Sequence, residues 1–426
     1  MPRSSALRRV LVWATAATAL AASAACSTKD DEAATGSASD AESGALATGP
    51  GVTDDTITLG VLTDQSGPFA GASRGIAQGR QLFWDARNAD GGVCDRTVEF
   101  TVTDHAYNAQ NATTQYAAMQ PEVLAFDELL GSPMIDALRP TIDQDNVLTM
   151  AVSFSSSVLE SPSMVVTGAT YDIEMINALQ WLMDEGRIAE GDTVGHIHLE
   201  GDYGENALAG AEHAAAELGV EIAAQKVQPT DSDLTAAVTA VDDAGASVVL
   251  LTTTPPQAAS AVAVAQASGL DLTFVGSNPS FSPALLASPA ADALQASYLM
   301  VSSIAPYASD APGPTAVRDA FATQFAGETP THFVMYGYAQ GELMAQILDT
   351  ACETGALTRE GLQGAFQSLE NVDTQGLMAP MDFSEPGQPP AREVVILRPD
   401  ATVDGGLTEV QGLFASPLAT DYQLAG

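Results

Sequence analysis

The chain contains few basic residues, and this scarcity excludes one class of function. Its 426 residues include 15 Lys and Arg against 54 Asp and Glu, which leaves a formal net charge of −39. Nucleic-acid binding requires clustered Lys and Arg to neutralise phosphates, so we predict no nucleic-acid partner. A hydrophobic content of 46% with 16% charged residues also excludes a disordered acidic polymer.

Long apolar runs are also scarce, and the most prominent one opens the chain. Three arginines lie within the first nine residues, and an Ala-, Leu- and Val-rich run follows over residues 10–25. This run is shorter than the roughly 20 residues that a membrane-spanning helix needs. A basic start followed by a short apolar run is typical of a signal peptide, which we predict over residues 1–25.

The residue directly after this leader is a cysteine that bears on localisation. Residues 23–26 (SAAC) resemble a bacterial lipobox, which implies that Cys26 carries diacylglycerol and anchors the chain to the outer face of the cell membrane. A lipobox usually has Leu where Ser23 stands, so plain cleavage near Ala25 remains an alternative. Residues 26–51 are rich in small and polar residues and predict a flexible tether.

Cysteine is rare, and only two lie beyond Cys26. Cys94 and Cys352 are separated by 352 − 94 = 258 residues. Two thiols in an exported chain are more often paired than free, so we predict a disulfide between them. Two separate buried thiols are the alternative.

From residue 56 onward, short β-branched runs alternate with longer helical periods. Strands are predicted at residues 57–62, 97–102, 123–130, 147–151, 193–199, 220–227, 247–252 and 272–276. Helices are predicted at residues 73–88, 109–119, 133–143, 172–185, 204–218, 232–244 and 256–268. Nearly continuous apolar strands separated by helices predict parallel sheets that are covered on both faces. Because the series restarts after residues 168–171, we predict an α/β fold of two doubly wound lobes.

The loops after the predicted strands are small and rich in hydroxyl groups. They cover residues 63–68, 131–133, 153–157, 252–254 and 276–278. Ligands of open parallel sheets bind beyond the carboxyl ends of the strands. Hydroxyls and free amides at helix starts suit an uncharged polar group or a carboxylate, although some of these hydroxyls equally suit helix capping.

An ordered set of motifs resembles one known family. The motifs are residues 57–63 (ITLGVLT), 66–70 (SGPFA), 88–93 (NADGGV), 200–204 (EGDYG) and 336–339 (YGYA). Together they resemble type I periplasmic binding proteins, most closely the leucine/isoleucine/valine and amide-binding branch, over residues 52–400. The resemblance implies a monomeric solute-binding protein of an ABC importer that has no cofactor and no enzymatic activity. It would capture an amino acid, amide or related carboxylate and deliver it to the permease subunits.

The resemblance also implies a division into lobes joined by three crossovers. The first lobe would comprise residues 52–170 and 308–371, and the second residues 171–302 and 377–426. The hinge would lie near residues 168–172, 302–307 and 372–376. This division places Cys94 and Cys352 in the same lobe, in agreement with the predicted disulfide.

The resemblance further implies which residues contact the ligand. The expected set is Phe69, Ser132, Ser153, Phe154, Ser155, Tyr203, Thr253, Asn278 and Phe281. The serines would hold a carboxylate, Tyr203 would form a wall in the second lobe, and the phenylalanines would contact an apolar body. Relatives that bind α-amino acids supply an acid for the ammonium after the strand ending at Gly276, whereas residues 277–281 contain none. Either Asp202 or Glu200 takes that role, or the ligand lacks an α-ammonium.

Three other interpretations of the sequence were weighed. The first is a sensory ectodomain of the same fold, and the other two rest on residues outside the expected ligand-binding set. Residues 71–75 match the GxSxG pattern of serine hydrolases, but the preceding strand ends near residue 62, so we interpret Ser73 as a helix N-cap. His196, His198 and Glu200 alternate along one predicted strand, yet that strand is expected to be buried on both faces, so we predict no metal site there.

Overall fold

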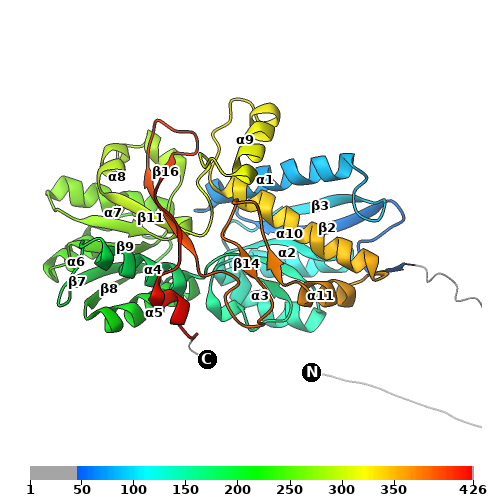
Figure 1. Ribbon diagram of the computed structural model, residues 1–426, viewed down its shortest axis with the longest axis horizontal. Helices are drawn as coiled ribbons and strands as arrows, with labels where there is room; N and C mark the ends of the chain where they lie inside the picture. Colours follow the sequence, from blue (N-terminus) through cyan, green and yellow to red (C-terminus); the bar gives the residue numbers. More distant parts are fainter. Residues whose placement is uncertain (1–45, 425–426) are drawn as a thin grey trace, which may run out of the picture. The chain divides into compact units, whose positions relative to one another are not determined.

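The computed structural model describes residues 46–424, so the predicted signal peptide, Cys26 and the tether up to residue 45 lie outside the described residues. Two main sheets organise this part of the chain, and Figure 1 shows them side by side. We name the part built on the five-stranded sheet lobe I and the part built on the seven-stranded sheet lobe II. The predicted α/β fold with two doubly wound lobes is confirmed.

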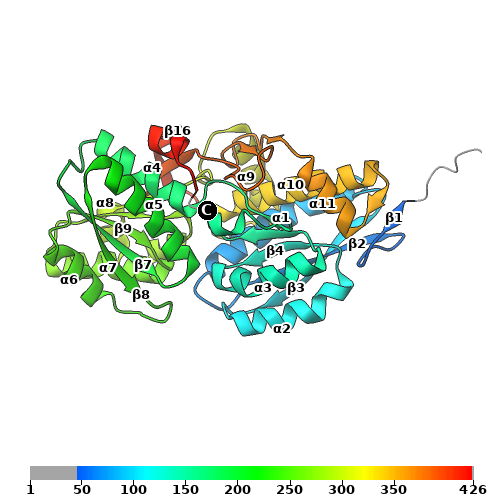
Figure 2. The ribbon, with the colours of Figure 1, turned by 90° about the horizontal axis from the view of Figure 1, so that it is seen from below.

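Lobe I contains a fully parallel sheet in the order β3-β2-β4-β5-β6. Its strands are β2 (Thr56–Thr63), β3 (Thr97–Asp104), β4 (Phe126–Leu130), β5 (Thr149–Val152) and β6 (Met164–Val165). Its helices are α1 (Ala70–Ala89), α2 (Ala109–Met119), α3 (Ser132–Asp145), α9 (Pro312–Gln324), α10 (Phe333–Glu353) and α11 (Arg359–Gln367). Right-handed crossovers place α1 on one face and α2 and α3 on the other. Helix α10 packs along α1 and completes that layer (Figure 2).

Lobe II contains a mixed sheet in the order β16-β15-β11-β10-β9-β7-β8. Its parallel strands are β7 (Thr193–Leu199), β8 (Glu221–Val227), β9 (Val248–Thr252), β10 (Thr273–Gly276) and β11 (Tyr298–Ser302). The antiparallel edge strands are β15 (Val394–Pro399) and β16 (Leu407–Phe414). Its helices are α4 (Tyr171–Asp184), α5 (Asp202–Leu218), α6 (Thr235–Asp243), α7 (Pro255–Ser268), α8 (Ala291–Ser297) and α12 (Pro417–Asp421). The antiparallel edge departs from the purely parallel sheet that the sequence pattern predicts.

Short elements complete the fold. Strands β1 (Ala47–Thr48) and β12 (Ala356–Leu357) pair in parallel, and β13 (Asn371–Val372) and β14 (Met381–Asp382) pair in antiparallel fashion. Turns of 3-10 helix lie at Gln120–Glu122, Ser156–Val158, Asn278–Ser280 and Pro283–Ala287. Because β1 is paired, the last residues of the predicted tether are part of the folded chain.

The two remaining cysteines are joined. Cys94 follows α1 and Cys352 lies near the end of α10, and the two form a disulfide with a Cα–Cα distance of 6.2 Å. The predicted pairing is confirmed. Since it links residues 258 apart, it ties the end of α10 to the loop between α1 and β3.

Three segments that connect the two sheets lie beside one another. Gly168 has a φ of 81°, and a Cβ at this position would collide with the Ser303 hydroxyl and lie 3.1 Å from the Met378 methyl group. Ile304 and Met378 form an antiparallel bridge, and the N–H of Ala379 donates to the carbonyl of Ser303 at 2.8 Å. The backbone crossings are therefore in direct contact with one another.

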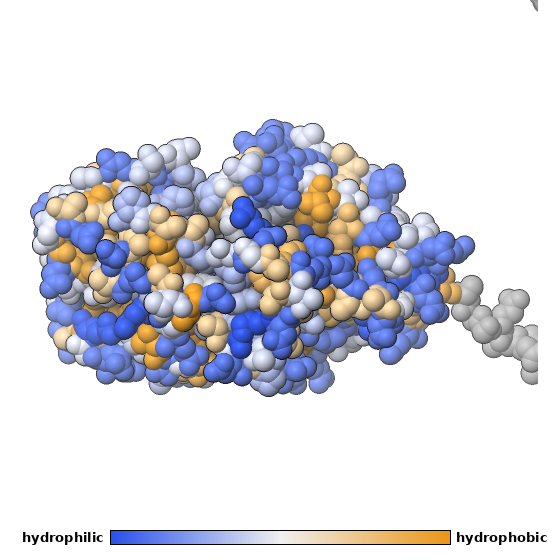
Figure 3. All heavy atoms as spheres, turned by 90° about the horizontal axis from the view of Figure 1, so that it is seen from above, coloured by the Kyte–Doolittle hydropathy of each residue, from blue (hydrophilic) through white to orange (hydrophobic). Residues whose placement is uncertain are grey.

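The surface of the described residues is largely hydrophilic. The face in Figure 3 intersperses hydrophilic residues with small apolar patches. Among residues 46–424, the exposed large hydrophobic side chains are Val102, Val410 and Leu413. In this same span, none of the helices has the length and apolar character needed to cross a membrane.

Candidate functional site

The strand orders place a crevice at the same position in each lobe. In lobe I, β2 lies between β3 and β4, so the connections leave it toward opposite faces. In lobe II, β7 lies between β8 and β9 in the same way. Loops beyond the carboxyl ends of such strands diverge and leave room for a ligand. Phe69, Ser132 and Tyr203 follow β2, β4 and β7, respectively.

These loops line a partly open cavity of about 30 Å³, far smaller than the roughly 300–1,000 Å³ of typical small-molecule sites. Its lining consists of Phe69, Ala72, Tyr107, Leu130, Gly131, Ser132, Val152, Phe154, Tyr171, Tyr203, Pro279 and Phe333. Both lobes contribute to it. In the part of the chain that the structure describes, no charged side chain lines this cavity. The cavity therefore offers a small and largely apolar surface with few hydrogen-bonding groups.

Aromatic rings form most of the wall. The ring centroids of Phe69 and Tyr107 are 4.9 Å apart, and those of Tyr171 and Tyr203 are 4.5 Å apart. Phe154 meets Tyr171 edge to face at 5.7 Å. Because Phe154 belongs to lobe I and Tyr203 to lobe II, the chain of rings joins the two lobes across the cavity.

The polar part of lobe I lies at the start of α3. Gly131 has a φ of 103°, and a Cβ there would meet Met134 and Tyr107, so the turn from β4 into α3 requires glycine. The Ser132 hydroxyl lies 2.7 Å from that of Ser153, which follows β5. A serine pair at a helix N-terminus provides hydroxyl donors beside the positive end of the helix dipole.

The polar part of lobe II is the Tyr203 hydroxyl. It lies 2.5 Å from the Ser277 hydroxyl and donates to the carbonyl of Thr253 at 3.4 Å. Burial raises the pKa of Tyr203 well above its usual range. Burial also raises the pKa values of Tyr107 and Tyr171. All three phenols are therefore uncharged hydrogen-bonding groups at neutral pH.

The structure brings together part of the predicted set. Phe69, Ser132, Phe154 and Tyr203 line the cavity, and Ser153 bonds to Ser132 behind it. The Ser155 hydroxyl instead caps the turn that begins at Ser156, and Phe281 packs against Tyr298. The Thr253 carbonyl accepts from Tyr203, and Asn278 is buried with its amide oxygen bonded to Ser302.

Several lining residues were missed by the sequence interpretation. Tyr107, Tyr171 and Phe333 belong to the loop after β3 and to the first residues of α4 and α10. Ala72, Leu130, Val152 and Pro279 were missed as well. Tyr107 follows a predicted strand, so the rule that ligands bind beyond the carboxyl ends of strands was sufficient to select it. Phe333 carries no such signal, because its position depends on α10 packing against α1.

Neither acid suggested for binding an ammonium lines the cavity. Asp202 accepts a hydrogen bond from the Ser157 hydroxyl at 2.8 Å, and the exposed Glu200 accepts from Gln228. A different acid, Glu174 of α4, is buried and accepts the N–H of Asn278 at 3.2 Å. Burial raises the pKa of Glu174 well above its usual range, which favours its uncharged form.

Ser73 is placed differently from its prediction. It is the fourth residue of α1, where its N–H donates to the carbonyl of Phe69 at 3.0 Å. Phe69 occupies the N-cap position, so the interpretation of Ser73 as a cap was wrong. The helix begins three residues earlier than its apolar periodicity indicates. Ser73 consequently lies within a regular helix instead of on a strand-to-helix elbow.

The alternating histidines of β7 are part of the lobe II core. His196 lies 3.0 Å from the Thr252 hydroxyl of β9, and both His196 and His198 are buried. Glu200 is exposed and bonds to Gln228. No group of three or more His, Cys, Asp or Glu side chains that suits a metal ion occurs within residues 46–424.

Comparisons with known proteins agree with this geometry. A family model described as periplasmic binding protein matches residues 56–405. A fatty acid ABC transporter substrate-binding protein from Thermomonospora curvata is 38% identical, with a TM-score of 0.87, covering 89% of this chain and 97% of that one. No curated protein matches the chain.

More distant structures share the fold. A branched chain amino acid ABC transporter protein from Thermus thermophilus, solved with bound valine, is 18% identical, with a TM-score of 0.75 and coverage of 86% and 98%. A leucine binding protein from Thermotoga maritima is 16% identical, with a TM-score of 0.72 and coverage of 84% and 99%. The resemblance drawn from the motifs is thus confirmed. The chain belongs to the periplasmic binding protein family, whose members bind small molecules outside the cytoplasm and work with ABC transporter permeases, and it is an ABC transporter substrate-binding protein.

Proposed function

We propose that this protein captures a carboxylate that has an apolar body and no α-ammonium group. The observation that carries the proposal is the cavity between the lobes, whose lining includes six aromatic rings, Leu130 and Val152 but no charged side chain among the described residues. An ammonium group placed there would lose its hydration without gaining a counter-charge. The 38% identical protein from Thermomonospora curvata is named for fatty acid transport, which supports the same ligand class.

The carboxylate is proposed to bind at the start of α3, with the Ser132 hydroxyl as its donor and Ser153 positioning that hydroxyl through the hydrogen bond between the two serines. Tyr203 and Tyr171 would contact the ligand from lobe II. Because the two sets of contacts come from different lobes, the ligand stabilises the closed arrangement over any arrangement in which the lobes are apart. Hydrogen bonds between the lobes, such as Ser157 to Asp202 at 2.8 Å, would add to that stabilisation.

The crossings are proposed to act as the hinge. The segments near Gly168, Ser303 and Met378 touch one another, so a small rotation at these points moves one lobe against the other. The closed protein would then be recognised by the permease subunits. We further propose that the protein is monomeric, which light scattering tests directly.

We also propose that Cys26 carries a lipid anchor. Diacylglycerol on Cys26 would keep the binding protein at the outer face of the membrane, close to its permease. Intact mass of the mature protein is expected to show a diacylated Cys26 at the N-terminus. An unmodified N-terminus at another residue would contradict the anchor without affecting the ligand proposal.

Calorimetric titration with octanoate, octanamide and leucine tests the ligand class. Octanoate is expected to bind most tightly, because only it combines an apolar body with a carboxylate and no ammonium. Ser132→Ala is expected to weaken octanoate binding at least about tenfold, as loss of a hydrogen bond to a charged group costs about 1.5–3 kcal/mol. Thr113→Ala, on the exposed side of α2, is the matched control. Tighter binding of leucine than of octanoate would contradict the proposal.

A further inference from the structure

The cavity adjoins a second, larger groove. The groove has a volume of about 460 Å³ and shares Phe69, Ala72 and Pro279 with the cavity. We propose that the cavity holds only the carboxyl end of the ligand, and that a long acyl chain passes between Ala72 and Pro279 into this groove. The inference rests on the proposed carboxylate binding and deepens it. It assigns the protein to long-chain monocarboxylates and makes Ala72 a determinant of chain length.

The groove offers a surface that fits a hydrocarbon chain. Lobe I contributes Pro68 and Gly71, and lobe II contributes Pro255, Pro256, Phe281 and Leu285. These proline rings and apolar side chains present carbon surface to the chain. Polar groups of the same lining come from Arg74, Ser282, Thr329 and Thr331. We name this surface the proline groove. Each methylene removed from water by such a surface contributes about 0.8 kcal/mol, so a chain that continues along the groove binds more tightly than one that stops in the cavity.

The passage between cavity and groove lies at the first turn of α1. Gly71 and Ala72 are the second and third residues of this helix, and both are small. A Cβ added to Gly71 would lie 3.1 Å from the Ser282 hydroxyl of lobe II, so the two lobes approach closely beside the passage. A side chain larger than alanine at position 72 projects from the wall that cavity and groove have in common.

Cavity size separates short from long ligands. The cavity of about 30 Å³ has room for little more than a carboxyl group, whereas the proline groove, at about 460 Å³, lies within the range of small-molecule sites. A short acid extends only a little beyond the cavity. A long acid requires both spaces and therefore requires an open passage at Ala72.

The test is calorimetric titration of the mature chain with butanoate, octanoate and dodecanoate, each below its micelle concentration. Affinity is expected to rise about fourfold per added methylene between octanoate and dodecanoate, which corresponds to about 0.8 kcal/mol per methylene. Ala72→Leu is expected to weaken dodecanoate binding at least tenfold and butanoate binding less than twofold. Ala77→Leu, on the same helix but in neither lining, is the matched control and is expected to change neither affinity.

A second variant separates a loss of binding from misfolding of the Ala72→Leu protein. Leu285→Ser makes the proline groove more polar on the lobe II side, away from the cavity lining, and is expected to weaken dodecanoate binding alone. Equal affinities for octanoate and dodecanoate in the unaltered protein, or equal losses for short and long acids in both variants, would overturn the inference. Failure of every monocarboxylate to bind would instead reject the proposed function.

Discussion

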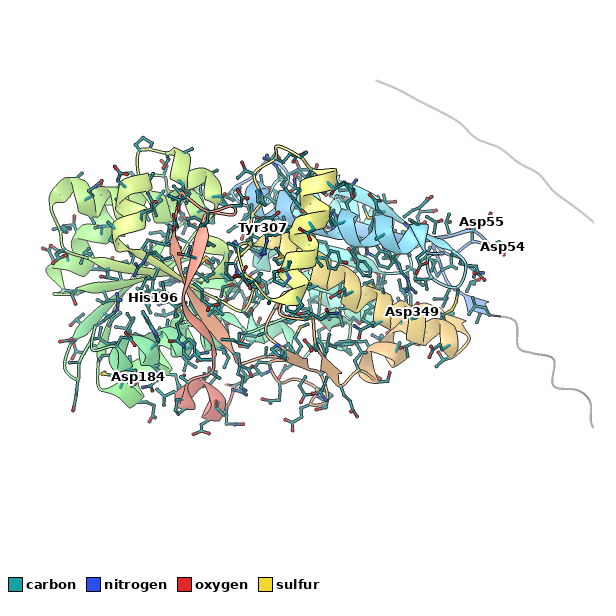
Figure 4. The ribbon with its side chains drawn as sticks, turned by 45° about the horizontal axis from the view of Figure 1, so that its top comes forward. Asp54, Asp55, Asp184, His196, Tyr307 and Asp349 are labelled. Atoms are coloured by element: carbon teal, nitrogen blue, oxygen red, sulfur yellow. A yellow bond between two sulfur atoms is a disulfide. The ribbon has the colours of Figure 1, made fainter. Side chains whose placement is uncertain are left out.

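The two sheets bury polar side chains in contrasting ways. In lobe I, the buried Arg80 of α1 donates to Glu128 of β4 at 2.6 Å and lies 3.7 Å from Asp127. In lobe II, the buried His196 of β7, labelled in Figure 4, makes a neutral hydrogen bond with Thr252 at 3.0 Å. The comparison shows two ways of satisfying a polar group in a core: a counter-charge in one sheet, and an uncharged partner in the other.

The contrast extends to pH. Burial raises the pKa of Asp127 to about 7, although Arg80 acts in the opposite direction. Burial lowers the pKa of His196 to about 3. Between about pH 3.8 and 7, the folded protein keeps a proton on Asp127 that the unfolded chain releases. Between about pH 3 and 6.5, the unfolded chain binds a proton on His196 that the folded protein excludes. Acidification therefore has opposite effects on the two lobes through these residues.

Two tryptophans allow the lobes to be followed separately. Trp84 lies in α1 of lobe I and Trp181 in α4 of lobe II. The third tryptophan, Trp13, lies in the predicted leader. In a mature protein that carries Trp181→Phe, fluorescence reports lobe I, and in one that carries Trp84→Phe it reports lobe II. Urea titrations of these two backgrounds measure the free energy of unfolding for each lobe.

Removal of the disulfide is expected to have the largest effect. Opening the 258-residue loop with Cys94→Ser and Cys352→Ser should lower the free energy of unfolding by about 5 kcal/mol in the chain-entropy account. The loss should be larger in the lobe I background, because both cysteines belong to that lobe. An equal loss in the two backgrounds would show that the lobes unfold as one unit.

Loss of the buried cation is expected to come next. Arg80→Met leaves the buried Glu128 without its counter-charge, which typically costs about 3–5 kcal/mol. The change should appear in the lobe I urea transition. A loss below about 1 kcal/mol would mean that the carboxylate is neutralised in another way.

The histidine of lobe II should impose a measurable pH slope. With the folded pKa below the ordinary 6.5, stability falls as pH decreases from about 6.5 toward about 3, by at most about 1.4 kcal/mol per pH unit. His196→Gln keeps a hydrogen-bonding group but does not titrate, so it should flatten the slope of the lobe II background over this range. An unchanged slope would assign the pH response to other groups.

The aspartate of lobe I should give a slope of opposite sign. With the folded pKa above the ordinary 3.8, its contribution to stability is complete below about pH 3.8 and is lost as pH rises through about 7. Asp127→Asn should remove this contribution from the lobe I background. Urea midpoints measured between pH 4 and 8 test the sign, and a steeper gain on acidification in the variant would contradict it.

The partly exposed ion pair between α1 and α10 is expected to give the smallest effect. Arg87 donates to Asp349 of α10, a residue labelled in Figure 4, at 2.7 Å, but the two side chains remain 34% and 39% exposed. Arg87→Met should cost less than about 1 kcal/mol, because water already screens the pair. This variant is the matched control for Arg80→Met, since both arginines lie on the same helix.

The alternation of apolar runs with helical periods was enough to predict the lobes, because that signal is local. Residues 97–102, for example, were predicted as a strand and form most of β3 (Thr97–Asp104). The ends of helices were predicted less accurately where the terminal residues carry no apolar periodicity. The first helix was expected to begin at residue 73, because Gly71 and Ala72 are small and give no periodic signal. In the structure, α1 begins at Ala70.

The binding site was predicted only in part, for a related reason. Phe69, Ser132, Phe154 and Tyr203 follow strands, so the rule that ligands lie beyond strand ends was sufficient to select them. Phe333 belongs to a helix hundreds of residues from β2 in the sequence. It reaches the cavity because α10 packs against α1, which no local pattern reveals.

The amino-acid sequence determined the acidic character of the chain, the α/β lobes and the family, because composition and ordered motifs are properties of the chain alone. Tertiary structure decided which loops face one another, that neither Asp202 nor Glu200 lines the cavity, and that the cavity continues past Ala72 into the proline groove. These features depend on strand order and on contacts between lobes, and such contacts join residues that are far apart in the sequence.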